Sequence, residues 1–152
     1  MIEVIGDIWK YKADVKCVTT NGYVRKDGKA VMGRGVALQA VGRWPILATV
    51  LGTLLTGGEN VPYIIGGPPA IPFPVVSFPV KHHWKDKADL ELIRRSAEKL
   101  VILASNHPEW KTYVIPRPGC GNGQLSWSEV EPVIEPILDD RFHIIELEAR
   151  LD

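Results

Sequence analysis

The stretch from residue 114 to residue 129 constrains the fold of this chain most, because it joins a strand, a glycine-rich loop and a helix start. Apolar residues 113–115 predict the strand, and Ser126 with Glu129 forms the S-x-x-E capping box that opens a helix. The loop holds three glycines at alternating positions: Gly119, Gly121 and Gly123. Glycines permit positive φ angles and expose successive N–H groups, and the helix adds its positive dipole end. Such a concavity favours an anion, most often phosphate, although a connection without a ligand explains this stretch equally well.

Two phosphate-binding motifs with fixed spacing are absent. The Walker loop needs G-x-x-x-x-G-K-[ST], and no stretch of the chain has it. The dinucleotide fingerprint G-x-G-x-x-G also fails, because residues 119–123 read Gly-Cys-Gly-Asn-Gly. The loop is therefore neither of the standard kinase type nor a Rossmann loop.

A second glycine loop runs into a helix start earlier in the chain. Residues 22–30 are polar, contain the Asp27-Gly28 turn pair and predict an exposed excursion. Gly33 and Gly35 follow, and an apolar segment of helical spacing begins after them. Two glycine-lined helix entries in one small domain can hold the two ends of an elongated anion such as a diphosphate.

Strands and helices alternate along the chain. Strands are predicted at 2–5, 14–21, 111–116 and 142–147, and two more on either side of a turn at 66–69. Six prolines lie between 61 and 79, and proline cannot donate to a ladder, so the proline-bearing part is predicted at a sheet edge. Helices are predicted at 45–56, at 87–105 with Asp86 as the cap, and at 127–138. This order predicts an α/β fold, a three-layer α/β/α sandwich with a central mixed six-stranded sheet, in a single domain of residues 1–152.

Ligands of such sheets usually bind in the crevice beyond the carboxyl ends of the strands. Asn21, Lys81 and the loop at 117–125 all follow predicted strands. We therefore expect these three parts of the chain to share one crevice.

Composition bounds the partners and the location. At 152 residues, with 45% hydrophobic and 24% charged content, the chain fits one globular domain with a full core. Its formal net charge of zero excludes tight nonspecific binding to nucleic acid or an acidic membrane through bulk charge, so such a partner has to be met locally. No signal peptide and no apolar run of about 18 residues is present. We expect a cytoplasmic monomer that does not contact membranes.

The two cysteines form neither a zinc spacing nor a disulfide framework, which favours a reducing cytosol. Cys17 lies in a predicted strand and Cys120 lies in the glycine loop. A metal site of Cys120 with His82 and His83 is the weaker alternative, so no metal is predicted.

Separated stretches of the chain carry a family pattern in one order. They are Gly-Asp-Ile at 6–8, residues 17–21 with 30–37, and residues 119–125 with Trp127. Together they resemble the macrodomains, a family that binds ADP-ribose. In that pattern the aspartate accepts a hydrogen bond from the adenine amino group. The asparagine strand and the first glycine loop surround the distal ribose, and the second glycine loop wraps the diphosphate.

Within the macrodomains, two motifs resemble the branch of terminal ADP-ribose glycohydrolases and of antitoxins that remove ADP-ribose from thymidine in DNA. Residues 32–35, Met-Gly-Arg-Gly, are similar to the M-G-x-G loop of that branch, and residues 78–84, Phe-Pro-Val-Lys-His-His-Trp, to the antitoxin segment around a catalytic lysine. The resemblance implies that Lys81, as a neutral amine, attacks the anomeric carbon of the distal ribose, and that water resolves a Schiff-base type intermediate. The open alternative is a solvated or phosphate-contacting lysine.

The resemblance implies an ADP-ribose site without cofactor or metal, in a hydrolase that removes ADP-ribose from DNA thymidine or from an acidic protein side chain. The implied binding residues are Asp7, Ile8, Asn21, Met32, Gly33, Arg34, Gly35, Val36, Pro118, Gly119, Cys120, Gly121, Asn122, Gly123, Gln124 and Leu125. A noncatalytic ADP-ribose reader and a phosphatase acting on ADP-ribose 1''-phosphate are the alternative functions.

The chain departs from the pattern of that branch in several places. Gly123 stands where the protein-directed glycohydrolases carry an aspartate, which favours the DNA-directed branch or a weaker hydrolase. Val18 replaces the first family asparagine, while Asn21 fills the second position. The insertion at 22–30 lies where the substrate approaches. The antitoxins also commonly carry a further domain that blocks the toxin, and none is predicted here.

Two side chains near these motifs have two interpretations each. Arg34 contacts phosphate or faces solvent, and the second is favoured because the family loop works chiefly through its main chain. Trp84 stacks on a base, as aromatic side chains do in single-strand binders, or packs at the helix entry, and the second is favoured. Its basic neighbours include Lys85 and Lys87.

Overall fold

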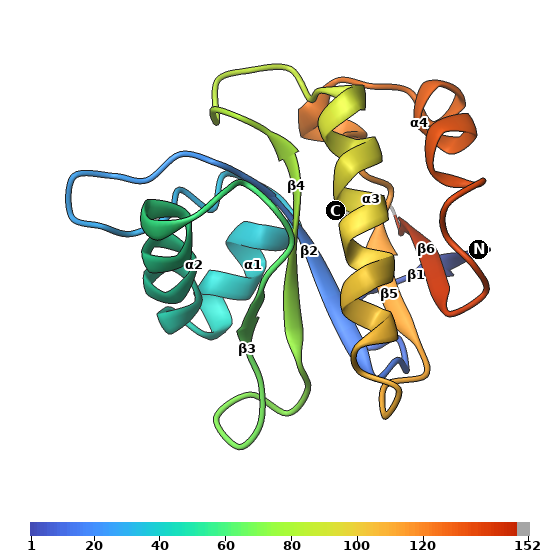
Figure 1. Ribbon diagram of the computed structural model, residues 1–152, viewed down its shortest axis with the longest axis horizontal. Helices are drawn as coiled ribbons and strands as arrows, with labels where there is room; N and C mark the ends of the chain where they lie inside the picture. Colours follow the sequence, from blue (N-terminus) through green and yellow to red (C-terminus); the bar gives the residue numbers. More distant parts are fainter. Residues whose placement is uncertain (149–152) are drawn as a thin grey trace.

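The computed structural model describes residues 1–148, in which six strands form one sheet and four α-helices cover it (Figure 1). In chain order the elements are β1 (Ile2–Gly6), β2 (Val15–Asn21), α1 (Val36–Arg43), α2 (Ile46–Gly57), β3 (Ile64–Gly66), β4 (Val75–Lys81), α3 (Leu90–Ser105), β5 (Tyr113–Pro116), the 3₁₀ turn η1 (Gly121–Gly123), α4 (Trp127–Ile134) and β6 (Phe142–Leu147). The predicted three-layer α/β/α sandwich with a mixed six-stranded sheet is confirmed.

The strand order in the sheet is β1-β6-β5-β2-β4-β3. All neighbouring pairs are parallel except β3 with β4, which is antiparallel. Because β2, β4, β5 and β6 run in the same direction, their carboxyl ends lie along one edge of the sheet. This edge is where a ligand crevice is expected in an α/β fold.

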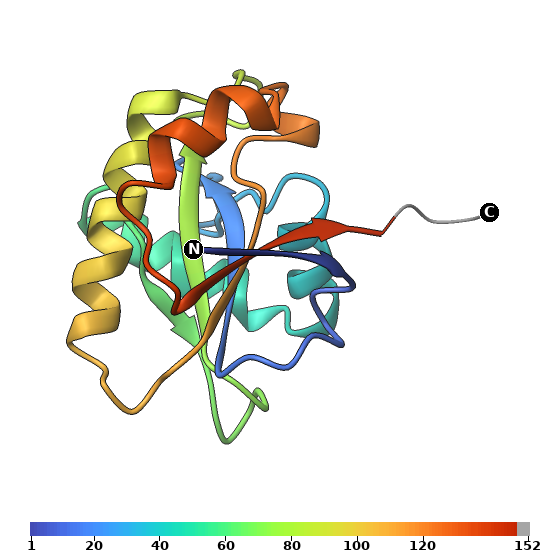
Figure 2. The same ribbon diagram turned by 90° about the vertical axis from the view of Figure 1, so that its right-hand side faces the viewer.

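The four inner strands β2, β4, β5 and β6 bury side chains on both faces of the sheet. In β5, Tyr113 and Ile115 pack in one core with α3 and α4, whereas Val114 between them packs in the other core with α1 and α2. This alternation follows the two-residue period of a strand. The two views of the ribbon show the two helix pairs on opposite faces of the sheet (Figure 2).

The cap of α3 differs from the sequence-based prediction. The helix begins at Leu90, and the Asp89 carboxylate accepts a hydrogen bond from the Glu91 N–H at 2.9 Å. A hydrogen bond with His82 is the main reason why the pKa of Asp89 is lowered. The predicted cap, Asp86, instead lies in a turn in which its N–H donates to the His83 carbonyl. Asp86 was therefore the wrong choice, because residues 84–88 form an irregular turn before the helix starts.

The last helix is shorter than predicted and ends at Ile134 rather than at Leu138. Pro132 lies inside it and Pro136 follows its end. Pro136 has no N–H to donate to the carbonyl four residues earlier, so the α-helical ladder stops there.

The prolines are compatible with the sheet because of where they lie. The edge strand β3 pairs with β4 only at Val75 and Val76. Pro79 lies further along β4, past these pairs, so its missing N–H breaks no hydrogen bond to β3.

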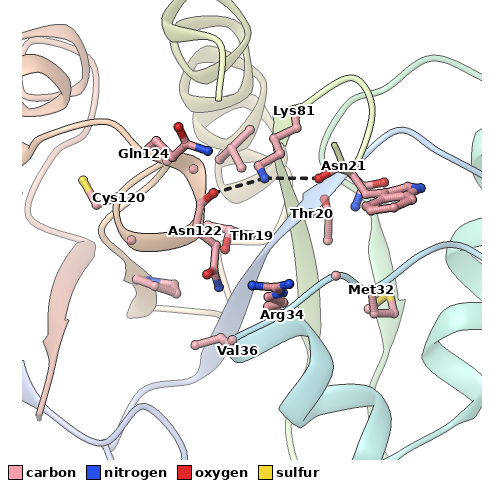
Figure 3. Close-up of a pocket in the computed structure, with 18 of the residues that line it drawn as sticks. Thr19, Thr20, Asn21, Met32, Arg34, Val36, Lys81, Cys120, Asn122 and Gln124 are labelled. Atoms are coloured by element: carbon pink, nitrogen blue, oxygen red, sulfur yellow. Dashed lines mark hydrogen bonds between the residues drawn. The ribbon is translucent and has the colours of Figure 1, made fainter. Parts of the chain in front are cut away.

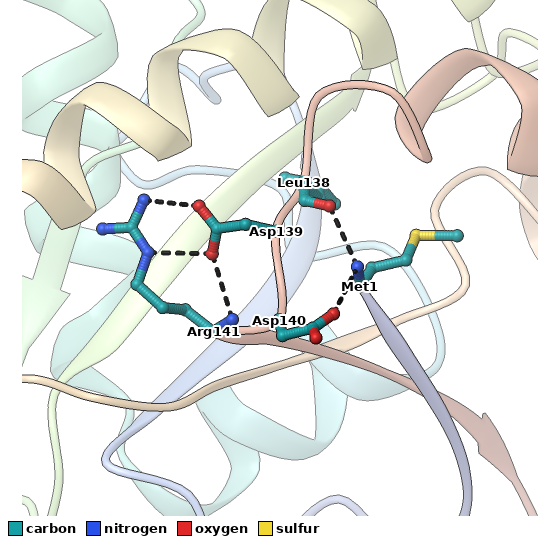
Figure 4. Close-up of polar contacts among 5 residues, drawn as sticks. All are labelled: Met1, Leu138, Asp139, Asp140 and Arg141. Carbon is teal, nitrogen blue, oxygen red and sulfur yellow. Dashed lines mark hydrogen bonds and ion pairs between the residues drawn. The ribbon is translucent and has the colours of Figure 1, made fainter.

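Contacts before β6 hold β1 beside it (Figure 4). The main-chain N–H of Arg141 and its guanidinium both donate to the Asp139 carboxylate, at 2.7–3.0 Å, and the guanidinium hydrogen bond lowers the pKa of that carboxyl. The amino group of Met1 donates to the Leu138 carbonyl at 3.0 Å and to Asp140 at 3.1 Å. The β1–β6 pairing starts directly after this turn, at Ile2 opposite His143.

Within residues 1–148, none of the helices taken singly has the length and apolar character needed to cross a membrane. The bent pair α1 and α2, with an angle of 116° between them, passes that test by length and composition.

Candidate functional site

A cavity of about 1150 Å³ opens at the carboxyl ends of β2, β4, β5 and β6. The strand ends contribute Thr19, Thr20, Asn21, Val80, Lys81, Pro116, Ile145, Glu146 and Leu147. Loop residues on both sides complete its wall, and Figure 3 shows part of this lining. The shared crevice expected from the order of strands and loops is therefore present, and its volume suits a ligand larger than a typical drug-sized molecule.

The two glycine loops meet in this cavity, although more than eighty residues separate them along the chain. Gly33 and Gly35 have φ angles of 61° and 69°, and Gly119 and Gly121 have φ angles of 74° and 75°. A Cβ atom added at Gly35 would lie 3.5 Å from Asn122 Nδ2, so the Asn122 side chain of the second loop lies next to Gly35 of the first. Positive φ angles at these four positions explain why both loops need glycine.

Gly123 does not have the positive φ angle that was predicted for the glycines of this loop. The left-handed conformation is taken by the next residue, Gln124, with φ 67°. A Cβ atom at Gly123 would lie 2.9 Å from the Cβ of Ala88, and the Ala88 N–H donates to the Gly123 carbonyl at 3.0 Å. Gly123 is therefore needed for the close approach of the loop to the segment before α3.

The positive helix end in the cavity belongs to α1 and not to α4. Gly35 and Val36, at the start of α1, line the cavity, and α1 has no side-chain cap. In contrast, the Glu129 carboxylate accepts from the Ser126 N–H at 2.8 Å and closes the start of α4, which lies outside the lining. The first N–H groups of α1 are thus available to an anion. The start of α4 is already occupied by the carboxylate of Glu129.

Lys81 stands at the end of β4 with its ammonium against the second glycine loop. Its Nζ donates to the Asn122 carbonyl at 3.2 Å and to the Trp84 carbonyl at 3.4 Å (Figure 3). A register shift in the β2–β4 pairing places Asn21 opposite Lys81. The lysine therefore lies between the strand that carries Asn21 and the loop predicted to hold a diphosphate.

The side chain of Asn21 spans the insertion that follows it. Its Nδ2 donates to the Val31 carbonyl at 2.9 Å, and its Oδ1 accepts from the Tyr23 N–H at 3.0 Å. The amide thus joins the two ends of the excursion at 22–30. Asn21 lines the cavity while doing so.

Sequence reasoning did not identify Asn60, which helps to position Lys81. The Nδ2 of Asn60 donates to the Lys81 carbonyl at 3.0 Å. A Cβ atom at Gly22 would lie 2.8 Å from this Nδ2, so the loop after β2 closes over it. Asn60 follows the glycine pair after α2, and no pattern in that loop distinguishes it as a supporting residue.

The cavity is positively charged although the chain as a whole is neutral. Five basic side chains line it, namely Arg25, Arg34, Lys81, Lys85 and Arg117, with a single acidic one, Glu146. Arg34 lies in the lining and is exposed, so its contact with a phosphate stays a prediction. Arg25, Lys85 and Arg117 were not in the predicted binding set, although Arg117 opens the loop at 117–125 that was expected in the crevice.

Arg117 is held loosely at the far side of the cavity. Its Nη2 lies 3.4 Å from Glu146 and 3.7 Å from Glu3, and its guanidinium lies over the Trp127 ring at 4.8 Å. Its Nε is buried and has no hydrogen-bond partner among the described residues. Trp127 lies outside the cavity lining and contacts the lining residue Arg117.

Four residues of the predicted binding set do not line the cavity: Asp7, Ile8, Pro118 and Leu125. The Asp7 carboxylate accepts from the Trp9 N–H at 2.9 Å, and Ile8 is buried. The loop after β1 is built around buried Lys16, whose Nζ donates to the Ile8 and Tyr11 carbonyls at 2.6 Å. Burial lowers the pKa of Lys16.

Cys120 and the two histidines near Lys81 do not form a metal site in the part of the chain that is described. No group of three or more His, Cys, Asp or Glu side chains in residues 1–148 is arranged to hold a metal ion. His82 lies 2.8 Å from Asp89, and the His83 ring packs against Tyr23. Burial raises the pKa of the Cys120 thiol, so the thiolate is disfavoured.

No family model matches the sequence. The DNA ADP-ribosyl glycohydrolase of Thermus aquaticus is 31% identical over 115 residues, which cover 72% of this chain and 31% of that protein. The protein of the same name from Mycobacterium tuberculosis is 30% identical over 105 residues, 66% of this chain and 30% of that protein. The chain spans about a third of the length of these curated relatives.

Solved structures share the fold over nearly the whole chain. The macrodomain of Thermus aquaticus DarG has a TM-score of 0.77 at 24% identity and covers 97% of both chains. Thermosipho africanus DarTG in complex with ADP-ribose has a TM-score of 0.75 at 21% identity, over 96% of this chain and 41% of that one. The fold and the cavity at its strand ends define a macrodomain.

The sequence matches place the chain more closely. It belongs to the macrodomain family and is related to the DNA ADP-ribosyl glycohydrolases.

Proposed function

We propose that this chain binds ADP-ribose in the cavity and removes it by hydrolysis from a modified macromolecule, with Lys81 as the nucleophile. The observation that carries the proposal is the meeting of both glycine loops at one cavity, with Lys81 Nζ 3.2 Å from the main chain of the second loop. The names of the two sequence relatives, and the ADP-ribose complex named for the Thermosipho africanus structure, support the same ligand.

The binding step uses the main chain more than side chains. The N–H groups at the start of α1 have no side-chain cap, and neither does η1 in the second loop. A diphosphate between the two loops receives hydrogen bonds from both, and Arg34 and Arg117 add positive charge to the cavity wall. A neutral chain can therefore hold a doubly charged ligand tightly at one place.

The proposed chemical step gives Lys81 the role that the family resemblance implies. In its neutral form the amine attacks the anomeric carbon of the distal ribose, and the bond from that carbon to the macromolecule breaks. The leaving atom takes up the proton that the attacking nitrogen loses. Opening of the ribose ring then gives a Schiff base. Water adds to it and releases ADP-ribose with the free amine, so no oxidant or cofactor is consumed.

A noncatalytic reader is the second candidate, and a contact of Lys81 favours it. Nζ donates to two carbonyl groups, which suits an ammonium, and an ammonium has no lone pair for attack. Gly123 also stands where the resemblance places an aspartate in the protein-directed glycohydrolases. Hydrolysis requires Nζ to lose its proton when the substrate displaces one of the two carbonyls.

The test separates binding from release. Calorimetry measures the affinity for ADP-ribose, and release is followed from an ADP-ribosylated thymidine oligonucleotide and from a protein ADP-ribosylated on glutamate. We expect Lys81→Ala to slow release by about 10³-fold or more while it still binds ADP-ribose. Lys99→Ala, on the exposed face of α3, is the matched control and keeps wild-type rates.

Three results decide between the candidates. Release that is lost only in Lys81→Ala supports the hydrolase. Wild-type protein that binds ADP-ribose but releases none from either substrate is a reader. No affinity for ADP-ribose in the wild-type protein overturns both.

A further inference from the structure

Three aromatic rings from two distant segments form a row at the mouth of the cavity. Tyr23 belongs to the insertion after β2, and its ring centroid lies 4.5 Å from that of His83. His83 in turn stacks on Trp84 at 5.6 Å with an interplanar angle of 28°. Tyr23 and Trp84 both line the cavity, yet they remain 39% and 44% exposed. Large rings left open to solvent at the edge of a site indicate a surface for a partner.

The row begins beside the proposed nucleophile. The carbonyl of Trp84 accepts a hydrogen bond from Lys81 Nζ at 3.4 Å. If Lys81 reaches the anomeric carbon of the distal ribose, the group attached to that carbon has to leave past these rings. The row is therefore placed to contact the macromolecule rather than the ADP-ribose itself, and this step rests on the proposed function.

Basic side chains accompany the rings. Lys85 Nζ lies 5.1 Å from the centre of the Trp84 ring, and both Lys85 and Arg25 line the cavity. The nearby acids are largely engaged, since Asp27 pairs with Arg25 and Asp89 pairs with His82, which leaves Asp86 exposed in the turn. Rings flanked by cations match a polyanion that presents flat faces.

The segment that carries Tyr23 and Arg25 is anchored rather than free. The Asn21 amide joins its two ends, and the Ala30 N–H donates to the Ala48 carbonyl in α2 at 2.9 Å. A Cβ atom at Gly52 in α2 would lie only 2.0 Å from the Gly28 carbonyl, so the helix packs directly on the segment. The ring of Tyr23 is thus held in place before any partner arrives, which lowers the entropy cost of binding.

We propose that Tyr23, His83 and Trp84, together with Arg25 and Lys85, form a stacking surface for the bases of a single-stranded nucleic acid that carries the ADP-ribose. Every base has a face that can stack on an aromatic ring, and the cations contact its phosphates. A duplex keeps these faces covered by neighbouring base pairs. An acidic protein side chain offers no aromatic face that can stack on the rings.

The test compares Trp84→Ala and Tyr23→Ala with Trp84→Phe, which keeps a ring. Affinity for a fluorescein-labelled single-stranded thymidine-containing oligonucleotide is measured by anisotropy, ADP-ribose affinity by calorimetry, and KM and kcat with the ADP-ribosylated oligonucleotide. We expect each alanine variant to weaken oligonucleotide binding and to raise KM by about 10-fold, with ADP-ribose affinity and kcat within about twofold of wild type. Trp84→Phe restores most of the affinity.

Trp110→Ala is the matched control, because Trp110 also stacks on a histidine, His107, at 4.2 Å but lies outside the cavity lining. Unchanged KM in both alanine variants overturns the proposal. An equal loss of affinity for free ADP-ribose also overturns the proposal, since the rings would then bind the nucleotide. An equal rise in KM for the ADP-ribosylated protein overturns it as well. A wild-type protein that binds the modified oligonucleotide more tightly than ADP-ribose, and loses this difference in Trp84→Ala, supports the surface even if release is never seen.

Discussion

Replacing Gly119 by alanine should destabilise the protein more than the same change at Gly121, two residues away. Both residues have nearly equal φ angles, 74° and 75°, so an L-residue pays the same backbone penalty of about 1–2 kcal/mol at either position. Their surroundings differ. A Cβ atom at Gly121 meets nothing within 4 Å, whereas one at Gly119 meets three apolar side-chain atoms at 2.8–3.0 Å.

The atoms near Gly119 belong to the core between the sheet and α3, from Ile93, Ala88 and Leu125. Forcing a methyl group into a filled core costs about 1–3 kcal/mol more. Gly119→Ala should therefore lose about 2–5 kcal/mol of unfolding free energy, against about 1–2 kcal/mol for Gly121→Ala. In a chain of this length each kcal/mol lowers Tm by about 2–4 °C.

Urea denaturation of both variants, with Tm as a second readout, measures the difference. Gly28→Ala is the control outside the glycine loop, because Gly28 has a φ angle of 85° and open space around it, and it should match Gly121→Ala. Equal losses at Gly119 and Gly121, with an unchanged m-value, would refute the packing argument. A loss at Gly119 alone, with none at Gly121 and Gly28, would refute the backbone argument.

Two other contacts give sharp stability predictions. Asp89→Ala removes the cap of α3 and should lose about 0.5–2 kcal/mol by urea denaturation, whereas Asp86→Ala should change little, and the reverse order would contradict the cap assignment. The folded-state pKa of Asp139 lies below its ordinary value of 3.8, so the unfolded chain takes up protons first as the pH falls. The stability that this carboxylate contributes above pH 3.8 is lost as the pH falls through the folded pKa, and Asp139→Asn should make Tm less dependent on pH below about 4. An unaltered acid-side slope would show that the ion pair with Arg141 adds nothing.

The position of Lys81 combines a motif with contacts that no motif contains. The segment around residue 81 is similar to a known catalytic segment, and β4 ends at this residue. Its Nζ, however, donates to the carbonyls of Trp84 and Asn122, and the Nδ2 of Asn60 donates to the Lys81 carbonyl. Because these partners come from three different loops, their distances depend on how the loops pack against one another.

The charge of the cavity is another property that appears only in the folded chain. Equal numbers of acids and bases give the sequence a net charge of zero. Folding brings basic side chains from residues 25, 34, 81, 85 and 117 to one wall with a single acid, Glu146. Composition averages over the whole surface, so it carries no information about such local separation of charge.

The sequence by itself determined the alternation of strands and helices, the three-layer sandwich, the positions of both glycine loops and the capping box at Ser126. These depend on residues close together in the chain, where hydrophobic period, glycine and capping chemistry act. Only the tertiary structure decided that Asp89 and not Asp86 caps α3, that α1 and not α4 directs its free N–H groups into the cavity, and that Tyr23 meets His83. Each of these depends on packing between segments far apart in sequence, and local propensity does not encode that packing.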